Sequence, residues 1–232
     1  MVKVYTALGR FDTKLVKSKS GKTVKVPIVK MKDKDYILSA DELIIWSSLA
    51  WNILTKDELT TAFNNKRTEL RNFADVSVNA VISGLAGRGL IAAGQDILLT
   101  DAVYRLISNL KIYHLKVDIW AKIRSFAHLV LVRRVAVKKA LRVFKEYAPD
   151  IDSEVKILKL VSKMDLSTAE LIKCFDSGNQ NINSVEKLID AICETDSTAG
   201  SLAGEMQFSD YNKLIIQAIT NLYINRSIIF EK

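Results

Sequence analysis

The sequence is poor in the residues from which catalytic and metal centres are built. Its 232 residues include two histidines and two cysteines. Neither His114 nor His128 has a Cys, His or carboxylate at metal-ligand spacing. A Ser-His-Asp order, a carboxylate pair beside a histidine and a nucleotide-binding loop are also missing from the sequence. We therefore expect no catalytic residue, no metal and no cofactor, and we predict that the protein is not an enzyme.

Paired cysteines and long apolar runs are missing as well. Cys174 and Cys193 form no CxxC motif, a usage typical of a reducing cytoplasm. Both fall on apolar helical faces, which favours buried packing. No apolar run approaches the length of a membrane span, and no signal peptide opens the chain. The sequence thus predicts a cytoplasmic protein without a membrane partner.

Charge is abundant but unevenly distributed. The formal net charge is +8, with 34 Lys and Arg against 26 Asp and Glu. Residues 1–38 carry ten basic against three acidic residues, and residues 116–148 carry nine against two. The segment between them is nearly neutral, with seven against eight, and residues 149–232 are acidic, with eight against thirteen. Two basic blocks favour a polyanionic partner, although two solvated faces would give the same pattern.

The first basic block is predicted to form strands. The runs KLVKS, TVKVPIVKM and DYILS, within residues 13–38, are joined by Ser-Gly and Lys-Asp turns. Pro27 has no amide hydrogen to donate, so its strand is expected at the edge of a sheet. We interpret the alternating lysines as protection of an exposed strand edge.

Helices are predicted after this block. The sequences Ser39-Ala-Asp-Glu42 and Thr55-Lys-Asp-Glu58 are capping boxes, each of which begins a short helix. A third helix is predicted from about Ser77 and ends at Gly89. Two apolar runs then flank Gly94-Gln95-Asp96, which predicts a short hairpin, and a fourth helix follows from Thr100.

This order of a strand, three helices, a hairpin and a helix, over roughly residues 36–112, resembles the winged helix-turn-helix domain of bacterial transcriptional regulators. Its most specific piece is VISGLAGRGLI, where Arg88-Gly89-Leu90-Ile91 turns the chain into the first strand of the wing. The resemblance implies duplex DNA as the partner and the third helix as the element that enters the major groove.

Candidate DNA contacts follow from the resemblance. Basic residues between the second and third helices lie where such a domain approaches the DNA backbone. Asn79 is the best direct reader, because its side-chain amide can bond an adenine edge. The candidates are Lys66, Arg67 and Arg71 for phosphates, and Ser77, Asn79, Ser83 and Arg88 on or beside the third helix.

Two features of the same region point away from a typical DNA reader. The outer face of the third helix holds Ala80 and Gly84, where winged-helix regulators often carry Arg or Lys. Small residues there fit a very close approach to DNA or packing against another protein. The hairpin holds Gln95 and Asp96 and no cation, which makes it a poor minor-groove probe.

Residues 118–148 contain no Gly or Pro and are predicted to form one long basic helix. Ile123, Phe126 and Val130 belong to its apolar stripe, while Arg134, Lys138 and Arg142 repeat every four residues on another face. We favour packing of this helix, either across a two-fold axis, which would make the protein a homodimer, or as a spine between the domains. Contact with nucleic acid and binding to a membrane surface are the alternatives.

The acidic residues 149–232 are predicted to form a helical domain. Capping boxes at Ser167–Glu170 and Asn183–Glu186 begin short helices whose succession echoes the first domain. The run RSIIF near the end is a candidate strand. A protein partner or a small effector is the expected ligand of this domain.

The sequence thus predicts a mainly α fold with a small β component. Its expected parts are a basic β-hairpin region (1–38), a winged helix-turn-helix (39–115), a long basic helix (116–148) and an acidic helical domain (149–232). The predicted function is that of a sequence-specific DNA-binding transcriptional regulator. The alternative is a replication or assembly factor of the tandem winged-helix type, or an adaptor that binds protein.

Overall fold

The computed structural model describes residues 1–17, 21–32, 34–69, 76–115, 149, 151–178 and 199–232. About 49% of these residues are helical and 26% lie in strands, which form three small antiparallel sheets. The expectation of a mainly α fold is therefore wrong, and the described part is an α/β mixture. The difference arises because several short strands with little sequence signal of their own pair with strands far away in the chain.

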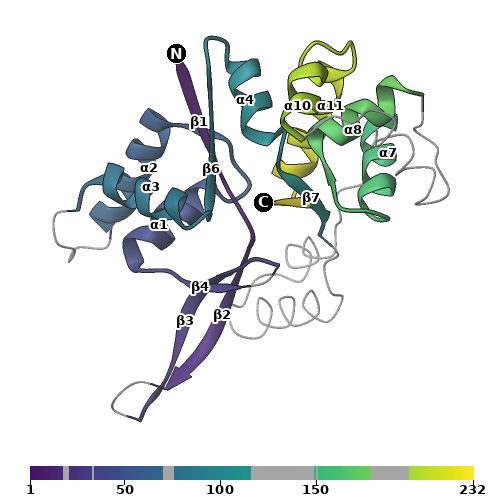
Figure 1. The fold of residues 1–232 in the computed structure, drawn as a ribbon. Helices are drawn as coiled ribbons and strands as arrows, with labels where there is room; N and C mark the ends of the chain where they lie inside the picture. Colours follow the sequence, from purple (N-terminus) through teal and green to yellow (C-terminus); the bar gives the residue numbers. More distant parts are fainter. Residues whose placement is uncertain (18–20, 33, 70–75, 116–148, 150, 179–198) are drawn as a thin grey trace, which may run out of the picture.

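The N-terminal unit combines a three-stranded sheet with a cluster of helices (Figure 1). The first strand of the chain lies in the middle of this sheet, in the order β5-β1-β6, and pairs antiparallel with both neighbours. The elements are β1 (Val2–Ala7), α1 (Ala40–Leu49), β5 (Leu54–Thr55), α2 (Lys56–Glu69), α3 (Val78–Gly87) and β6 (Ile91–Asp96).

The capping boxes predicted at Ser39 and Thr55 are confirmed by their hydrogen bonds. Glu42 accepts from the Ser39 backbone N–H at 2.8 Å, and its own N–H donates to the Ser39 hydroxyl at 3.3 Å. Thr55 and Glu58 repeat this exchange at 2.8 and 3.4 Å. Such reciprocal caps satisfy N–H groups that have no partner inside the helix, so four residues of sequence are enough to place each start. At the end of α3, Gly89 has the left-handed conformation expected of a terminating glycine, with φ of 70°.

The predicted hairpin at residues 90–99 does not form. Residues 91–96 are one strand, β6, and the chain then enters α4 (Leu99–Ile107), whose N-cap is Leu98 rather than Thr100. Gly94 is not a turn residue: a Cβ atom there would lie 2.2 Å from the Ala102 carbonyl oxygen and 2.5 Å from the Leu106 nitrogen. The glycine lets the backbone of α4 lie against the strand, and β1 occupies the place beside β6 that the second hairpin strand was expected to fill.

The C-terminal unit repeats the same strand arrangement. Its sheet has the order β8-β7-β9, so its first strand is again central, between a two-residue strand and the last strand of the unit. The capping box at Ser167 and Glu170 opens the helix after the short strand, as Thr55 and Glu58 do in the first unit. The described elements are β7 (Lys111–His114), α7 (Asp152–Val161), β8 (Leu166–Ser167), α8 (Thr168–Asp176), α10 (Ala199–Met206), α11 (Asn212–Ile224) and β9 (Ile228–Glu231).

Strand β1 lies between two hydrophobic cores. Tyr5 and Ala7 pack into a cluster with α1, α2 and α3, whereas Val4 and Leu8 join a larger cluster with α4 and the C-terminal unit. Both faces of the strand are therefore buried from Val4 to Leu8, and the one polar side chain within this stretch, Thr6, is buried as well.

Tyr223 of α11 joins the two units by hydrogen bonds. Its hydroxyl accepts from the Thr6 hydroxyl at 3.0 Å and from the Trp51 N–H at 3.1 Å, and it also lies 3.2 Å from the Leu49 carbonyl oxygen. Burial raises the pKa of this phenol, and the bonds from Thr6 and Trp51 oppose that rise. A buried hydroxyl with several partners fixes how α11 sits against β1 and the end of α1.

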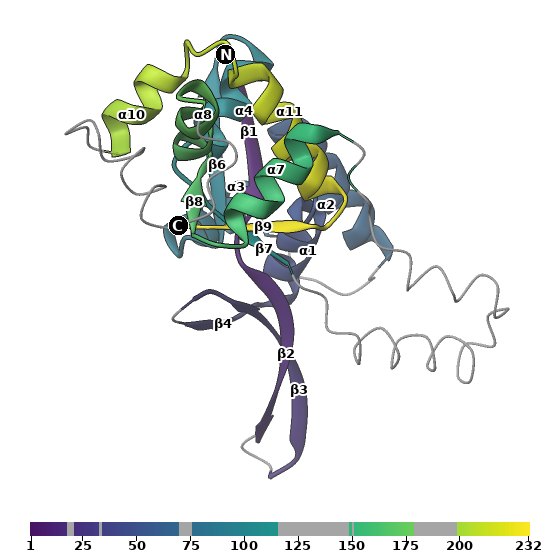
Figure 2. The same ribbon diagram turned by 90° about the vertical axis from the view of Figure 1, so that its right-hand side faces the viewer.

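A basic β-ribbon projects from the junction of the two units (Figures 1 and 2). We use the name ribbon for β2 (Arg10–Lys17) and β3 (Thr23–Lys30), with β4 (Asp35–Ile37) pairing along the base of β3. The expected hairpin is confirmed, but β3 is the middle strand, so the prediction of an edge position for Pro27 is wrong. Strand β4 pairs with β3 only from Ile28 onward, one residue after the proline. The N–H that Pro27 lacks is therefore not needed for the pairing with β4.

Two expectations concern other parts of the chain. Residues 118–148 and the capping box at 183–186 lie outside the described residues. The expected domain boundaries at residues 38 and 115 separate strands that pair with each other. Strand β1 precedes residue 38 but pairs with β6 in the sheet of the first unit. Strand β7 precedes residue 115 but pairs with β9 in the sheet of the second unit. Within the described residues, no helix is both long and apolar enough to cross a membrane.

Candidate nucleic-acid interface

Two of the predicted phosphate ligands are engaged inside the N-terminal unit. The Lys66 ammonium on α2 donates to the Ser48 hydroxyl at 3.0 Å and lies 3.3 Å from that of Ser47, both on α1. The Arg67 side chain is 17% exposed, lies over the Phe63 ring and has its Nε 3.9 Å from the Asp41 carboxylate. Lys66 and Arg67 therefore connect α2 to α1, and Arg67 also packs on Phe63 of α2 itself. Arg71, the third predicted phosphate ligand, lies outside the described residues.

Arg88 also makes contacts within the unit. Its guanidinium donates to the Ile37 carbonyl oxygen at 3.2 Å and forms an ion pair with Glu42, the capping-box glutamate of α1. The end of α3 is thereby tied to β4 and to the start of α1. A charge-assisted pair of this kind stabilises the fold more than an isolated surface ion pair does.

The outer face of α3 is open. Asn79 and Ser83 are exposed, and the small residues Ala80, Gly84 and Gly87 beside them are exposed as well. Ser77 occupies the N-cap position of α3 but makes no side-chain capping bond. The structure thus leaves the predicted base-reading residues accessible, on a face without a basic residue.

Accessible positive charge is concentrated on the ribbon and at its base. Lys14 and Lys30 pair with Asp35 at 3.0 Å and with Asp12 at 2.7 Å. Hydrogen bonds from the Lys30 side chain and the Thr13 backbone lower the pKa of Asp12 below its usual value. The other exposed cations of the ribbon and its base form no ion pair with any described residue; they are Arg10, Lys17, Lys22, Lys25, Lys34 and Lys232.

The base of the ribbon is fixed to both units. Gly9, between β1 and β2, has φ of 80°, and a Cβ atom there would lie 2.5 Å from the Met31 sulfur. A glycine is therefore required where the chain leaves the first sheet for the ribbon. The Gly9 N–H donates to the Phe230 carbonyl oxygen of β9 at 2.8 Å, and the Phe11 ring lies 6.2 Å from that of Trp46 on α1.

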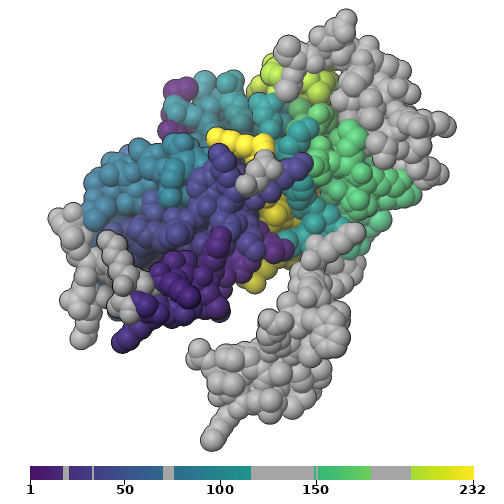
Figure 3. Space-filling model, turned by 60° about the horizontal axis from the view of Figure 1, so that its bottom comes forward, coloured from purple at the N-terminus to yellow at the C-terminus, as the bar shows by residue number. Residues whose placement is uncertain are grey.

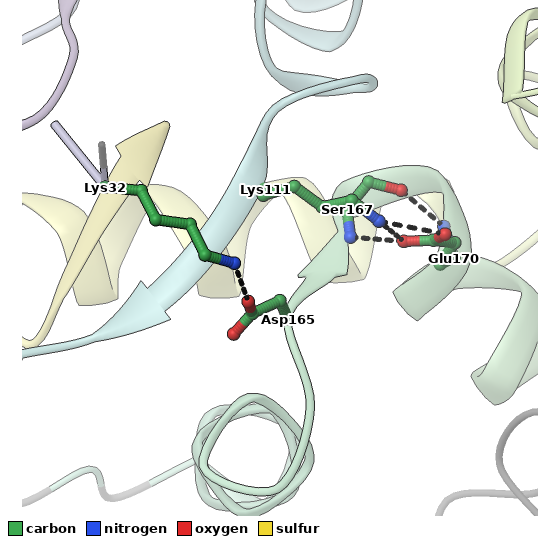
Figure 4. Close-up of polar contacts among 5 residues, drawn as sticks. All are labelled: Lys32, Lys111, Asp165, Ser167 and Glu170. Carbon is green, nitrogen blue, oxygen red and sulfur yellow. Dashed lines mark hydrogen bonds and ion pairs between the residues drawn. The ribbon is translucent and has the colours of Figure 1, made fainter. Parts of the chain in front are cut away.

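Lys32, in the turn between β3 and β4, makes the ribbon's main contacts with the C-terminal unit (Figure 4). Its ammonium lies 3.2 Å from the Asp165 carboxylate and above the Tyr113 ring, and its backbone N–H donates to Glu231 at 3.0 Å. Burial and the neighbouring Asp165 raise the pKa of Tyr113. Figure 4 also shows Lys111 bound to the capping-box glutamate Glu170 at 2.8 Å, which ties β7 to the start of α8.

A basic hollow surrounds this turn. We call it the turn hollow; it comprises two neighbouring spaces, of about 670 and about 230 Å³, whose linings share Met31, Lys32, Lys34 and Tyr36. Lys14 and Lys30 line the first space, and Glu231 and Lys232 line the second. In Figure 3 the yellow end of the chain lies against the indigo residues of this turn.

Sequence reasoning missed the turn hollow and interpreted the ribbon lysines as edge protection. The signal for the ribbon was present in the +7 charge of residues 1–38. The hollow had none, because Lys232 is about two hundred residues from Lys34 in the chain and approaches it through the pairing of β9 with β7.

Comparisons with protein-family models, with curated proteins and with solved structures found no match for this chain. Within the described residues, no group of three or more His, Cys, Asp or Glu side chains is placed to hold a metal ion. The residues themselves are thus the basis for a functional proposal.

Proposed function

We propose that the protein binds duplex DNA and that the ribbon supplies the phosphate contacts. The observation that carries the proposal is a contrast in pairing. Of the ribbon's cations, Lys14 and Lys30 are paired with acids, but Arg10, Lys17, Lys22 and Lys25 have no acidic partner among the described residues. By contrast, Lys66, Arg67 and Arg88 bind hydroxyls or carboxylates of the N-terminal unit. A two-stranded ribbon fits the major groove of B-form DNA, and lysines along it would lie near the phosphates of both strands.

Base reading is assigned in this proposal to the outer face of α3. Asn79 and Ser83 are accessible there, and Asn79 has the side-chain amide that suits an adenine edge. The ribbon would supply affinity and orientation, and α3 would supply sequence preference. The regulator role and the cytoplasmic location predicted from the sequence belong to this proposal.

The repeated strand order favours a second candidate function. Two units with the same arrangement in one chain suit a replication or assembly factor of the tandem winged-helix type, which would bind direct repeats as a monomer. A regulator that dimerises through residues 118–148 would protect a palindrome instead. Sedimentation, together with footprinting on a site selected from random DNA, separates the two.

The proposal is tested by fluorescence anisotropy with the full chain and a labelled 24-base-pair duplex. Replacing Lys17, Lys22 and Lys25 with Gln should lower affinity about a hundredfold or more at 100 mM salt, since each phosphate that is no longer neutralised keeps nearly one counterion. A control variant with Gln at Lys56, Lys159 and Lys213, which are exposed on helices, has the same net charge and should bind like the wild type. Equal losses in both variants, or a wild type that does not bind at 50 mM salt, would contradict the proposal.

A further inference from the structure

The turn hollow combines positive charge with an aromatic ring, and the duplex proposal does not use it. Among its lining residues, Lys34 and Lys232 have no ion-pair partner among the described residues. Asp35 is paired with Lys14 at 3.0 Å, and Glu231 accepts from the Lys32 backbone N–H but keeps its negative charge. The described lining residues hold five lysines against these two carboxylates, so their net charge is positive, which suits a phosphate group.

Tyr36 gives the hollow a flat apolar wall. It lies in β4, opposite Val29 of β3, and part of its side chain packs against the core of the N-terminal unit. The remainder lines both spaces of the hollow. A ring supported by a core and half-buried loses little freedom when a base stacks on it, and aromatic platforms within basic grooves are typical of single-strand binding.

Duplex DNA does not suit this place. The bases of a duplex are stacked on one another and offer no free face to the Tyr36 ring, whereas an unpaired nucleotide exposes one. The larger space, about 670 Å³, is open to solvent, so an unpaired base with its sugar can reach the ring from outside.

We propose that the turn hollow binds an unpaired nucleotide of single-stranded DNA, with the base on Tyr36 and the phosphates near Lys34 and Lys232. This inference rests on the proposed DNA binding and extends it from duplex to strand-separated DNA. The hollow lies at the base of the ribbon, so a strand that leaves a ribbon-bound duplex would reach it directly.

The test measures the anisotropy of fluorescein-labelled dT12 and of the 24-base-pair duplex with the full chain. Tyr36→Leu should weaken dT12 binding about tenfold, because stacking of one base contributes roughly 1–3 kcal/mol. Duplex affinity should change less than twofold, and Tyr36→Phe should keep the wild-type affinity for dT12. Tyr211→Leu, which changes a half-buried tyrosine on the C-terminal unit, is the matched control and should leave both affinities unchanged.

A second variant tests the phosphate contacts. Replacing both Lys34 and Lys232 with Gln should weaken dT12 binding more than replacing both Lys56 and Lys213 with Gln, which removes the same charge elsewhere. Each variant is expected to melt at the wild-type temperature, which would show that its fold is kept.

Several outcomes would overturn the inference. These are equal losses for dT12 and duplex in Tyr36→Leu, failure of Tyr36→Phe to retain binding, and wild-type affinity in the Lys34 and Lys232 variant. Displacement of dT12 by micromolar free dTMP would show that the hollow takes a free nucleotide instead of a strand. A wild type that binds the duplex but not dT12 overturns this inference alone, and one that binds dT12 but not the duplex overturns the ribbon proposal alone.

Discussion

The ribbon and the helical cluster α1–α3 use their basic residues in opposite ways. On the ribbon, Lys17, Lys22 and Lys25 extend into solvent without an acidic partner among the described residues. In the helices, Lys66, Arg67 and Arg88 bind hydroxyls, a carbonyl oxygen and carboxylates of neighbouring elements. A basic residue at a helix-turn-helix position is therefore not by itself evidence of a phosphate contact, because its nearest acceptor can be inside the domain.

The largest effect on stability that separates the two regions is expected at Arg88. Arg88→Ala removes an ion pair to Glu42 and a hydrogen bond to Ile37, so the free energy of unfolding should fall by about 1.5–3 kcal/mol, the range for hydrogen bonds of charged groups. Arg105→Ala is the control, because its pair with Asp96 is more exposed and should contribute less than about 1 kcal/mol. Urea denaturation provides the measurement. Equal losses in the two variants would remove the structural role assigned to Arg88.

A smaller and more selective effect is expected at Asn79. Asn79→Ala should weaken binding to a selected site by about 1–3 kcal/mol and leave binding to random DNA unchanged, because a base contact carries the sequence information. Gln217→Ala, which removes an exposed side-chain amide on α11 of the C-terminal unit, is a suitable comparison because no DNA contact is assigned to it. Competition titrations with both DNAs provide the measurement. If the Asn79→Ala variant bound both DNAs like the wild type, α3 would not read bases.

The smallest effect is expected at the junction between the ribbon and the C-terminal unit. Lys32→Gln keeps the backbone bond to Glu231 but removes the ion pair with Asp165. The side chains of Lys32 and Asp165 are 65% and 47% exposed. Stability should therefore fall by less than about 1 kcal/mol. Duplex affinity should fall no more than it does in Lys14→Gln, which breaks another exposed pair on the ribbon. A larger loss for Lys32→Gln would show that this contact sets the direction of the ribbon.

The features that were predicted from the sequence are local ones. The boxes at Ser39, Thr55 and Ser167 connect residues three apart, and the hairpin of the ribbon connects neighbouring strands, so short stretches contain the whole signal. The pairing of β1 with β6 connects residues about ninety apart and was missed. Gly94 was assigned to a turn because a glycine needed for close approach of α4 looks the same in a sequence as one needed for a turn.

The same distinction applies to the candidate site. Asn79 and Ser83 were correctly placed on the outer face of a helix, because helical periodicity fixes which side is exposed. The acceptors of Lys66 and Arg88 lie 18 and 46 residues away, on other elements, and periodicity says nothing about them. Which acceptor each cation binds is therefore visible only in the folded structure.

The most direct test of the contrast between the two regions is the salt dependence of duplex binding. The slope of log K against log salt counts the phosphates neutralised, at about 0.9 per contact. Gln at Lys17, Lys22 and Lys25 should reduce the magnitude of that slope by about 2 to 3 units, whereas Lys66→Gln and Arg88→Gln, measured singly, should leave it unchanged. An unchanged slope in the ribbon variant, with a reduction of about one unit in each helix variant, would show that the helices hold the DNA and that the ribbon does not.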